Sequence, residues 1–231
     1  MRLLELLEAY SPLASYYNST GDNGAVRNLE ALITPEEQLE FLATEMSGML
    51  KNCSQIISIY KQANGFLYRG MKHKPIAFES NIRTDRSTVE MHPEYAKALV
   101  RAYNALGIKA HRQNSIFTTP DRHKAHDWGN AYIVFPQNGF SFSYFTEIKS
   151  NYAYYRMENA AAAVVNPYDP HNFATDDEDI ASIVKVMKEL GITDKNLTYA
   201  IQQECEVLIT GAKFYAFSIE WQGVIRKWIG L

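Results

Sequence analysis

Several features that would define a class of protein are missing from this 231-residue sequence. It contains only two cysteines, Cys53 and Cys205, too few for a disulfide framework or a zinc site built from cysteines. No segment reaches the roughly 18 apolar residues that a membrane-spanning helix needs. Residues 1–10 include two glutamates within a short apolar stretch, which a signal peptide would not have. We therefore expect a soluble, cytoplasmic protein with reduced thiols and no membrane contact.

The common phosphate-binding and nucleophile motifs are missing too. The sequence has no G-x-G-x-x-G after a strand, no G-x-x-x-x-G-K-[ST] and no G-x-S-x-G. Ordinary dinucleotide-binding, P-loop and α/β-hydrolase folds are thereby excluded. His123 and His126 lie three residues apart without further ligands at a fixed spacing, so we expect no metal site.

The charge pattern gives no general indication of nucleic-acid binding. The net charge is −3 and the sequence pI is about 6.1, whereas a nucleic-acid-binding domain is usually basic. A local basic patch formed by Lys72, Lys74, Arg83 and Arg86 still leaves a nucleic-acid partner open.

The hydrophobic periodicity predicts an α+β protein that begins with helices. Apolar residues recur at three- and four-residue steps after Thr34-Pro35, so residues 1–62 are expected to be a helical region. Further helices are predicted over 93–107 and 175–191, the latter with a Thr175–Glu178 capping box. Strands are predicted at 65–71, 114–120, 130–136, 140–148, 205–210 and 213–221, the last two on either side of Gly211, and the Asn138-Gly139 dipeptide predicts a hairpin.

Two glutamates, Glu204 and Glu206, precede an apolar run one residue apart. In an extended backbone residues two apart point to the same face, so the carboxylates would lie side by side while Cys205 points into the core. Such a pair is either a solvated strand edge or a site that uses two acids. Two like charges at this distance would raise the pKa of each other.

Three short segments, taken in order, resemble the Arg–Ser–Glu signature of the mono-ADP-ribosyltransferases. They are Tyr68-Arg69-Gly70, the hydroxyl-rich strand from Ser115 to Thr119, and "ECEVLI" from Glu204 to Ile209. The resemblance covers about residues 65–220 and is closest to the branch related to cholera toxin and clostridial toxins, with some likeness to bacteriophage-encoded members. The glutamate motif is the most specific part. The middle strand departs from the Ser-Thr-Ser pattern, which leaves open whether Ser115 or Thr118-Thr119 is its counterpart.

The resemblance implies an ADP-ribosyltransferase-like split β-sandwich over residues 63–231, preceded by the helical region 1–62. It implies a toxin-like transferase that uses NAD as substrate and needs no metal, acting in the cytoplasm, including that of a host cell. The acceptor would be arginine on a protein. Residues 1–62 would complete the core, cover the site or bind a partner.

The resemblance also implies a role for each motif residue. Glu206 would stabilise the positive charge that develops on the ribose as the nicotinamide bond breaks, and Glu204 would position an acceptor arginine. Arg69 would hold a phosphate or ribose of NAD, because a guanidinium binds such groups bidentately. Ser115, or Thr118 in its place, would orient Glu206. Residues that would complete the cofactor contacts are Gly70, Tyr68, Phe117 and Tyr132, the three aromatic ones as ring-stacking partners.

Three other functions stay open on the sequence alone. They are an NAD glycohydrolase, in which water replaces the acceptor, a nucleic-acid ADP-ribosyltransferase, and a structural or partner-binding protein on the same fold without enzymatic activity.

Overall fold

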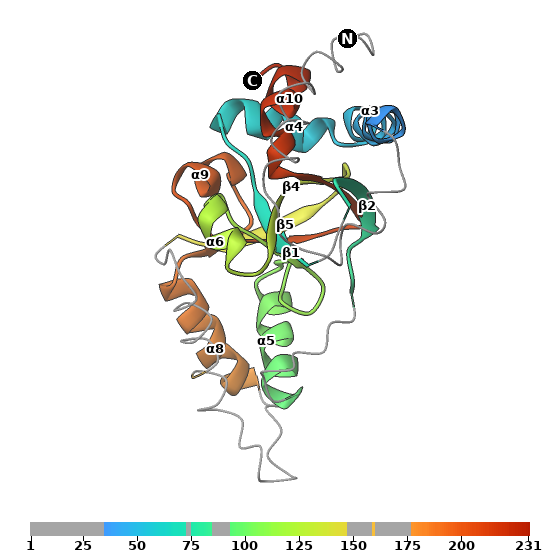
Figure 1. Cartoon of the computed structure of the whole chain (residues 1–231). Helices are drawn as coiled ribbons and strands as arrows, with labels where there is room; N and C mark the ends of the chain where they lie inside the picture. The colour runs from blue at the N-terminus through green and yellow to red at the C-terminus, as the bar shows by residue number, and fades with distance from the viewer. Residues whose placement is uncertain (1–34, 73–74, 85–92, 147–158, 160–176) are drawn as a thin grey trace.

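The computed structural model describes residues 35–72, 75–84, 93–146, 159 and 177–231, and there it is a mixed α+β protein (Figure 1). It contains two four-stranded sheets in which neighbouring strands are antiparallel. The first sheet has the order β1 (Tyr68–Met71), β4 (Asn130–Pro136), β8 (Lys213–Ser218), β2 (Ala77–Asn81). The second has the order β3 (Ile116–Thr118), β7 (Val207–Thr210), β5 (Ser141–Phe145), β6 (Ile192–Thr193). The predicted α+β class is confirmed.

Three helices lie together above the first sheet: α3 (Pro35–Asn52), α4 (Ser54–Ala63) and α10 (Gln222–Ile229) (Figure 1). They share one apolar core with the strands, in which Tyr60 of α4 contacts Phe135 of β4 edge-on, with ring centroids 5.3 Å apart. The described part of the N-terminal helical region therefore completes the core. The predicted helical region is divided at position 53, because Cys53 leaves helical geometry and separates α3 from α4.

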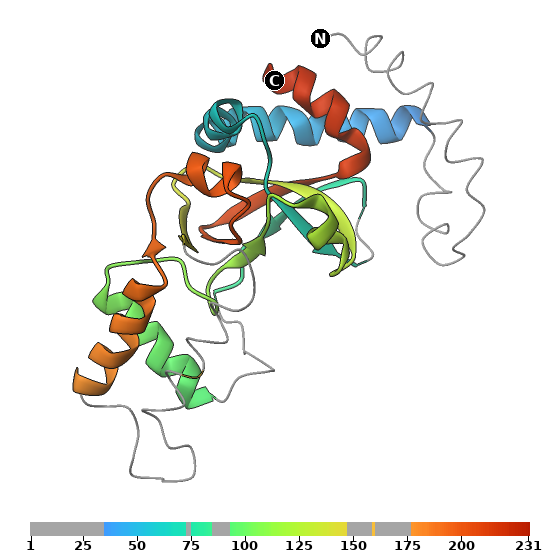
Figure 2. The ribbon, with the colours of Figure 1, turned by 90° about the vertical axis from the view of Figure 1, so that its left-hand side faces the viewer.

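Two further helices, α5 (Pro93–Ala105) and α8 (Asp177–Glu189), stand side by side at the opposite end of the molecule (Figures 1 and 2). Residues of both helices form a second apolar cluster, which also includes Leu208 of β7 in the second sheet. Both helices were predicted, and each ends two residues before a glycine, Gly107 and Gly191, which adopt left-handed φ angles of 70° and 69°. The proposed cap at Thr175 lies outside the described residues.

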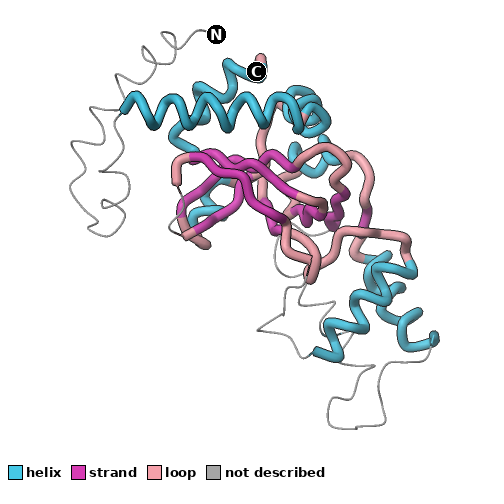
Figure 3. The backbone as a smooth tube through the Cα atoms, turned by 90° about the vertical axis from the view of Figure 1, so that its right-hand side faces the viewer, coloured by secondary structure: helices cyan, strands magenta, loops and turns pink. Residues whose placement is uncertain are grey.

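The predicted hairpin at Asn138-Gly139 is wrong. β4 belongs to the first sheet and β5 to the second, and the two strands do not pair with each other. The turn docks instead against the α3–α4 junction, where Asn138 N–H donates to the Asn52 carbonyl at 2.8 Å and its side chain accepts from the Gln55 N–H at 2.9 Å. The connection therefore carries the chain from one sheet to the other. Figure 3 shows the strands between the helices near the chain termini and the helices at the opposite end of the molecule.

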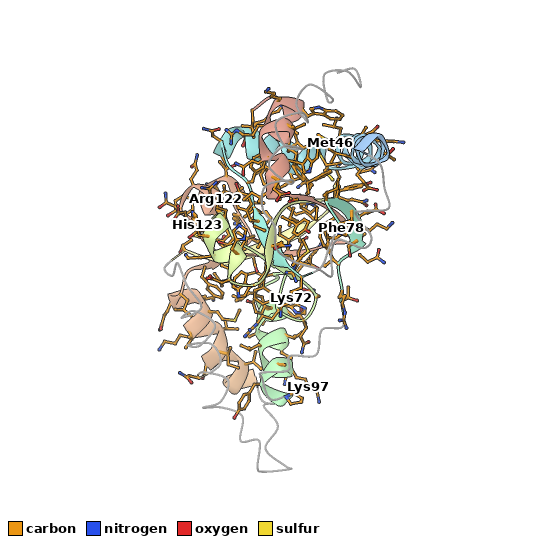
Figure 4. All side chains as sticks on the ribbon, in the orientation of Figure 1. Met46, Lys72, Phe78, Lys97, Arg122 and His123 are labelled. Atoms are coloured by element: carbon orange, nitrogen blue, oxygen red, sulfur yellow. The ribbon has the colours of Figure 1, made fainter. Side chains whose placement is uncertain are left out.

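Several short elements were missed or left undecided by the sequence. β2 lies in a stretch for which no strand was predicted. Its Phe78, labelled in Figure 4, contacts Tyr132 edge-on, with ring centroids 5.7 Å apart. The last predicted strand stops at Ser218 and continues into the 3-10 helix η1 (Ile219–Trp221) and α10, so the strand expected through Trp221 is too long. Two short α-helices complete the described part of the chain: α6 (Arg122–His126) and α9 (Leu197–Gln202).

Candidate functional site

Strand β3 joins the strand that carries Arg69 to the strand that follows Glu206. On one edge, Tyr68 N–H donates to the Thr119 carbonyl at 2.7 Å, and Thr119 N–H donates to the Tyr68 carbonyl at 2.8 Å. On the other edge, Thr118 pairs with Val207 at the start of β7. Three segments far apart in the sequence therefore meet in the order β1, β3, β7, and the two sheets are linked at this point.

Arg69 is the second residue of β1 and reaches across this junction. Its Nη1 donates a hydrogen bond of 2.9 Å to the backbone carbonyl of Phe117 in β3. β1 continues to Met71, which is also the end of the strand predicted over residues 65–71. The guanidinium faces the motif strand, because its hydrogen bond joins one motif segment directly to another.

Tyr68 lies on the other face of β1. Its hydroxyl donates to Gln222 of α10 at 3.2 Å, and its ring contacts Phe66 edge-on at 6.3 Å. The prediction that Tyr68 stacks on a ligand beside Arg69 is therefore wrong, because successive residues of a strand point to opposite faces. Tyr132 is directly opposite Arg69 in the β1–β4 ladder and is 3% exposed.

Close packing of α6 against β1 requires a glycine at position 70. A Cβ at this position would lie 2.0 Å from the Ala125 carbonyl of α6 and 2.8 Å from the Trp128 Cβ. Glycine therefore allows α6 to lie directly against β1. This helix begins at Asp121, whose carboxylate accepts the His123 N–H at 2.9 Å. Figure 4 shows Arg122 and His123 side by side on α6.

Glu206 immediately precedes β7 and is partly buried. Burial raises the pKa of its carboxyl from 4.5 to about 7, and the positive charges of Arg112 and Lys124 oppose this shift. The raising cause is therefore loss of water around the carboxyl rather than the neighbouring glutamate that the sequence suggested. A carboxyl poised near neutral pH is common at functional sites.

Phe117 interacts with two arginines, Arg69 and Arg112. Its carbonyl accepts from Arg69, and the guanidinium of Arg112 lies over its ring, 5.4 Å from the centroid. Arg112 also acts electrostatically on Glu206. A ring predicted to stack on nicotinamide thus contacts a cation instead. Sequence reasoning missed Arg112 and Lys124, although both flank the hydroxyl-rich strand closely.

The register decides which hydroxyl belongs with Glu206. Ile116 pairs with Ile209, so Ser115 lies at the end of β3 far from Glu206, and its Oγ donates to Asn114 at 2.9 Å. The prediction that Ser115 orients Glu206 is therefore wrong. Thr118 is opposite Val207 and donates its hydroxyl to the Val207 carbonyl at 2.9 Å, which fixes the backbone next to Glu206.

Glu204 does not share a strand face with Glu206, so the side-by-side arrangement expected from an extended backbone is wrong. It follows α9 in a turn with a left-handed φ of 56° and is exposed. The turn is closed by hydrogen bonds from the Glu204 N–H to the Ile201 carbonyl (3.2 Å) and from the Cys205 N–H to the Ala200 carbonyl (2.9 Å). Cys205 is buried in the core, as predicted.

The raised pKa of Glu206 makes protein stability depend on pH. Between pH 4.5 and about 7 the folded protein retains a proton on Glu206 that the unfolded chain releases, so stability falls as the pH rises through this window. Glu206→Gln removes this dependence. We expect urea unfolding at pH 5 and pH 8 to show the variant gaining stability relative to wild type at the higher pH. An equal difference at both pH values would contradict the burial of this carboxyl.

A metal-binding cluster and a membrane-spanning helix are two further features to consider in the described residues. No group of three or more His, Cys, Asp or Glu side chains in that part of the chain is arranged to hold a metal ion. Within the same ranges, no helix is both long enough and apolar enough to cross a membrane.

Comparison of the chain with protein-family models, with curated proteins and with solved structures finds no match. Function is therefore inferred from the motif residues and from the way in which β1, β3 and β7 bring them together.

Proposed function

We propose that this chain is an NAD-dependent mono-ADP-ribosyltransferase built on a split β-sandwich core of the ADP-ribosyltransferase type. One observation carries the proposal: Thr119, the residue after β3, is hydrogen-bonded to Tyr68 beside Arg69, and Thr118 at the end of β3 pairs with Val207 beside Glu206. The order Arg, hydroxyl strand, Glu in the sequence thus corresponds to three adjacent segments in space. If the three motifs occurred in the sequence by chance, the segments that carry them would have no reason to be neighbours in the fold.

In the proposed reaction the bond between nicotinamide and C1′ of the ribose breaks, and nicotinamide leaves with the bonding electron pair. The ionised Glu206 accepts a hydrogen bond from a ribose hydroxyl and stabilises the positive charge that develops on the sugar. Arg69 binds a phosphate or ribose oxygen of NAD while it holds the Phe117 carbonyl, since a guanidinium has five N–H donors. Thr118, rather than Ser115, fixes the backbone at the glutamate end of β7.

The acceptor is assigned to arginine on a protein through Glu204. Its carboxylate is exposed in the turn before β7, where a macromolecule would have access to it. A glutamate in a left-handed conformation is unusual, because glycine or asparagine is favoured there. Backbone strain of this kind often occurs at functional sites. Glu204 would position the guanidinium and take its proton as the nitrogen attacks C1′.

The test is to incubate the protein with NAD and a mixed cellular extract and to locate ADP-ribose by mass spectrometry. Adducts on arginine side chains would support the full proposal. Free ADP-ribose without adducts would change the assignment to an NAD glycohydrolase, and adducts on nucleic acid would change the acceptor. Intact NAD with no product would contradict the proposal and favour a binding protein on the same fold.

A further inference from the structure

Two buried polar atoms have no hydrogen-bond partners in the described residues, and they belong to side chains whose rings contact each other. The hydroxyl of Tyr103, near the end of α5, has no partner in the described residues although its side chain is 2% exposed. Nδ1 of His111 is likewise buried and without a partner. The two rings contact each other at an angle of 51°, with centroids 5.9 Å apart. Unsatisfied buried groups are rare and call for an explanation.

Their position connects these groups to Glu206. Tyr103 belongs to the apolar cluster that includes Leu208, which lies two residues after Glu206 and so points to the same face of the chain. Burial raises the pKa of Tyr103, Arg112 opposes the shift and the negative charge of Glu206 adds to it, so the hydroxyl lies within electrostatic range of both. His111 directly precedes Arg112 in the sequence.

Packing alone explains the rings but not the polar atoms. A phenylalanine at position 103 would fill the same space between α5 and β7 without burying an unpaired hydroxyl. Burial also lowers the pKa of His111, which keeps its ring neutral, so that one ring nitrogen donates and the other accepts. One alcohol group could satisfy both polar atoms, because it can accept a hydrogen bond from the tyrosine hydroxyl and donate one to the neutral imidazole.

We propose that Tyr103 and His111 form a hydroxyl-binding subsite beside Glu206, completed by a ribose hydroxyl of the substrate. Tyr103 Oη donates to the ligand oxygen, and the ligand hydroxyl donates to His111 Nδ1. The inference rests on the proposed function, because it takes the ribose to be that of NAD. In this arrangement Tyr103 and His111 bind the sugar while Glu206 acts on the charge at C1′.

The experiment compares wild type with Tyr103→Phe, using NAD and two analogues that lack the 2′- or the 3′-hydroxyl of the nicotinamide ribose. We expect Tyr103→Phe to raise KM for NAD about tenfold, the factor of one well-made hydrogen bond. It should have little effect on KM for the one analogue whose missing hydroxyl occupies the subsite. Tyr144→Phe, which removes a buried-ring hydroxyl that already donates to the Lys195 carbonyl at 2.8 Å, is the matched control and should leave KM unchanged.

The outcomes separate this inference from the proposed function. A wild-type protein that leaves NAD intact contradicts both. Two results would contradict the subsite alone, provided that the wild-type protein cleaves NAD. One is an unchanged KM for NAD in Tyr103→Phe. The other is an equal rise of KM for NAD and for both analogues in this variant. Urea unfolding gives a second readout: Tyr103→Phe should be at least as stable as wild type. A clear loss of stability would mean that the hydroxyl already has a partner within the folded protein, and would overturn the inference.

Discussion

Replacing Glu206 by glutamine is expected to reduce the release of nicotinamide from NAD by about 10²- to 10³-fold, the loss typical of removing one preorganised electrostatic group. Glutamine keeps the size and a hydrogen-bonding oxygen but cannot carry the negative charge. Transfer of ADP-ribose should fall by the same factor, because both reactions share the step that breaks the nicotinamide bond. The measurement is the initial rate of nicotinamide release at saturating NAD.

A matched control separates this effect from the general removal of a negative charge. Glu220, an exposed glutamate of η1, offers the same substitution away from β7. Glu220→Gln should keep the wild-type rate. The raised pKa of Glu206 adds a second check, since the wild-type rate should increase with pH up to about 7 as the carboxyl ionises. A Glu206→Gln variant as active as wild type would remove Glu206 from the mechanism.

Replacing Glu204 by glutamine is expected to separate the two activities. Transfer to arginine should fall by about 10²-fold, the lower end of the range for losing a general base. Hydrolysis of NAD should stay within about twofold of wild type, because water needs no guanidinium-positioning carboxylate. The measurement is label transfer to an arginine-containing acceptor alongside release of free ADP-ribose.

The structure makes this separation plausible on physical grounds. Glu204 is exposed in a turn, whereas Glu206 is partly buried at the start of β7. Replacing Glu204 should therefore leave the surroundings of the Glu206 carboxylate unchanged. Glutamine should also retain the turn, because the hydrogen bonds that close it involve only backbone atoms. Equal loss of transfer and hydrolysis would contradict the division of roles between the two acids.

The parts of the fold that the sequence predicted are those governed by local rules. α5 and α8 have clear helical periodicity and terminating glycines, and β7 is a short run of apolar and β-branched residues. The Asn138-Gly139 hairpin was wrong because a turn preference is local, whereas the partners of β4 and β5 are set by β8 and β7, far along the chain. β2 was missed because its residues are largely polar and its strand character comes from pairing with β8.

The candidate site also combines residues that the sequence alone could identify with residues that only the tertiary structure could identify. Arg69 and Glu206 could be singled out from the order of the motifs, and the structure brings their strands together through β3. Ser115 could not be separated from Thr118 without the register, because that choice depends on which residue is opposite Val207. Arg112 and Tyr103 could not be assigned to the site at all, since their proximity to Glu206 comes from tertiary folding.

The central claim is that Arg69, the β3 strand and Glu206 together form one binding site for NAD. NMR of the ¹⁵N-labelled Glu206→Gln protein during NAD titration tests it directly, since we expect this variant to bind NAD and to consume it about 10²- to 10³-fold more slowly than wild type. The account predicts saturable amide shifts concentrated at residues 69–70, 117–119 and 205–207. Absence of any shift at millimolar NAD, or shifts confined to the far edge of the first sheet around Glu79 and Lys213, would contradict it.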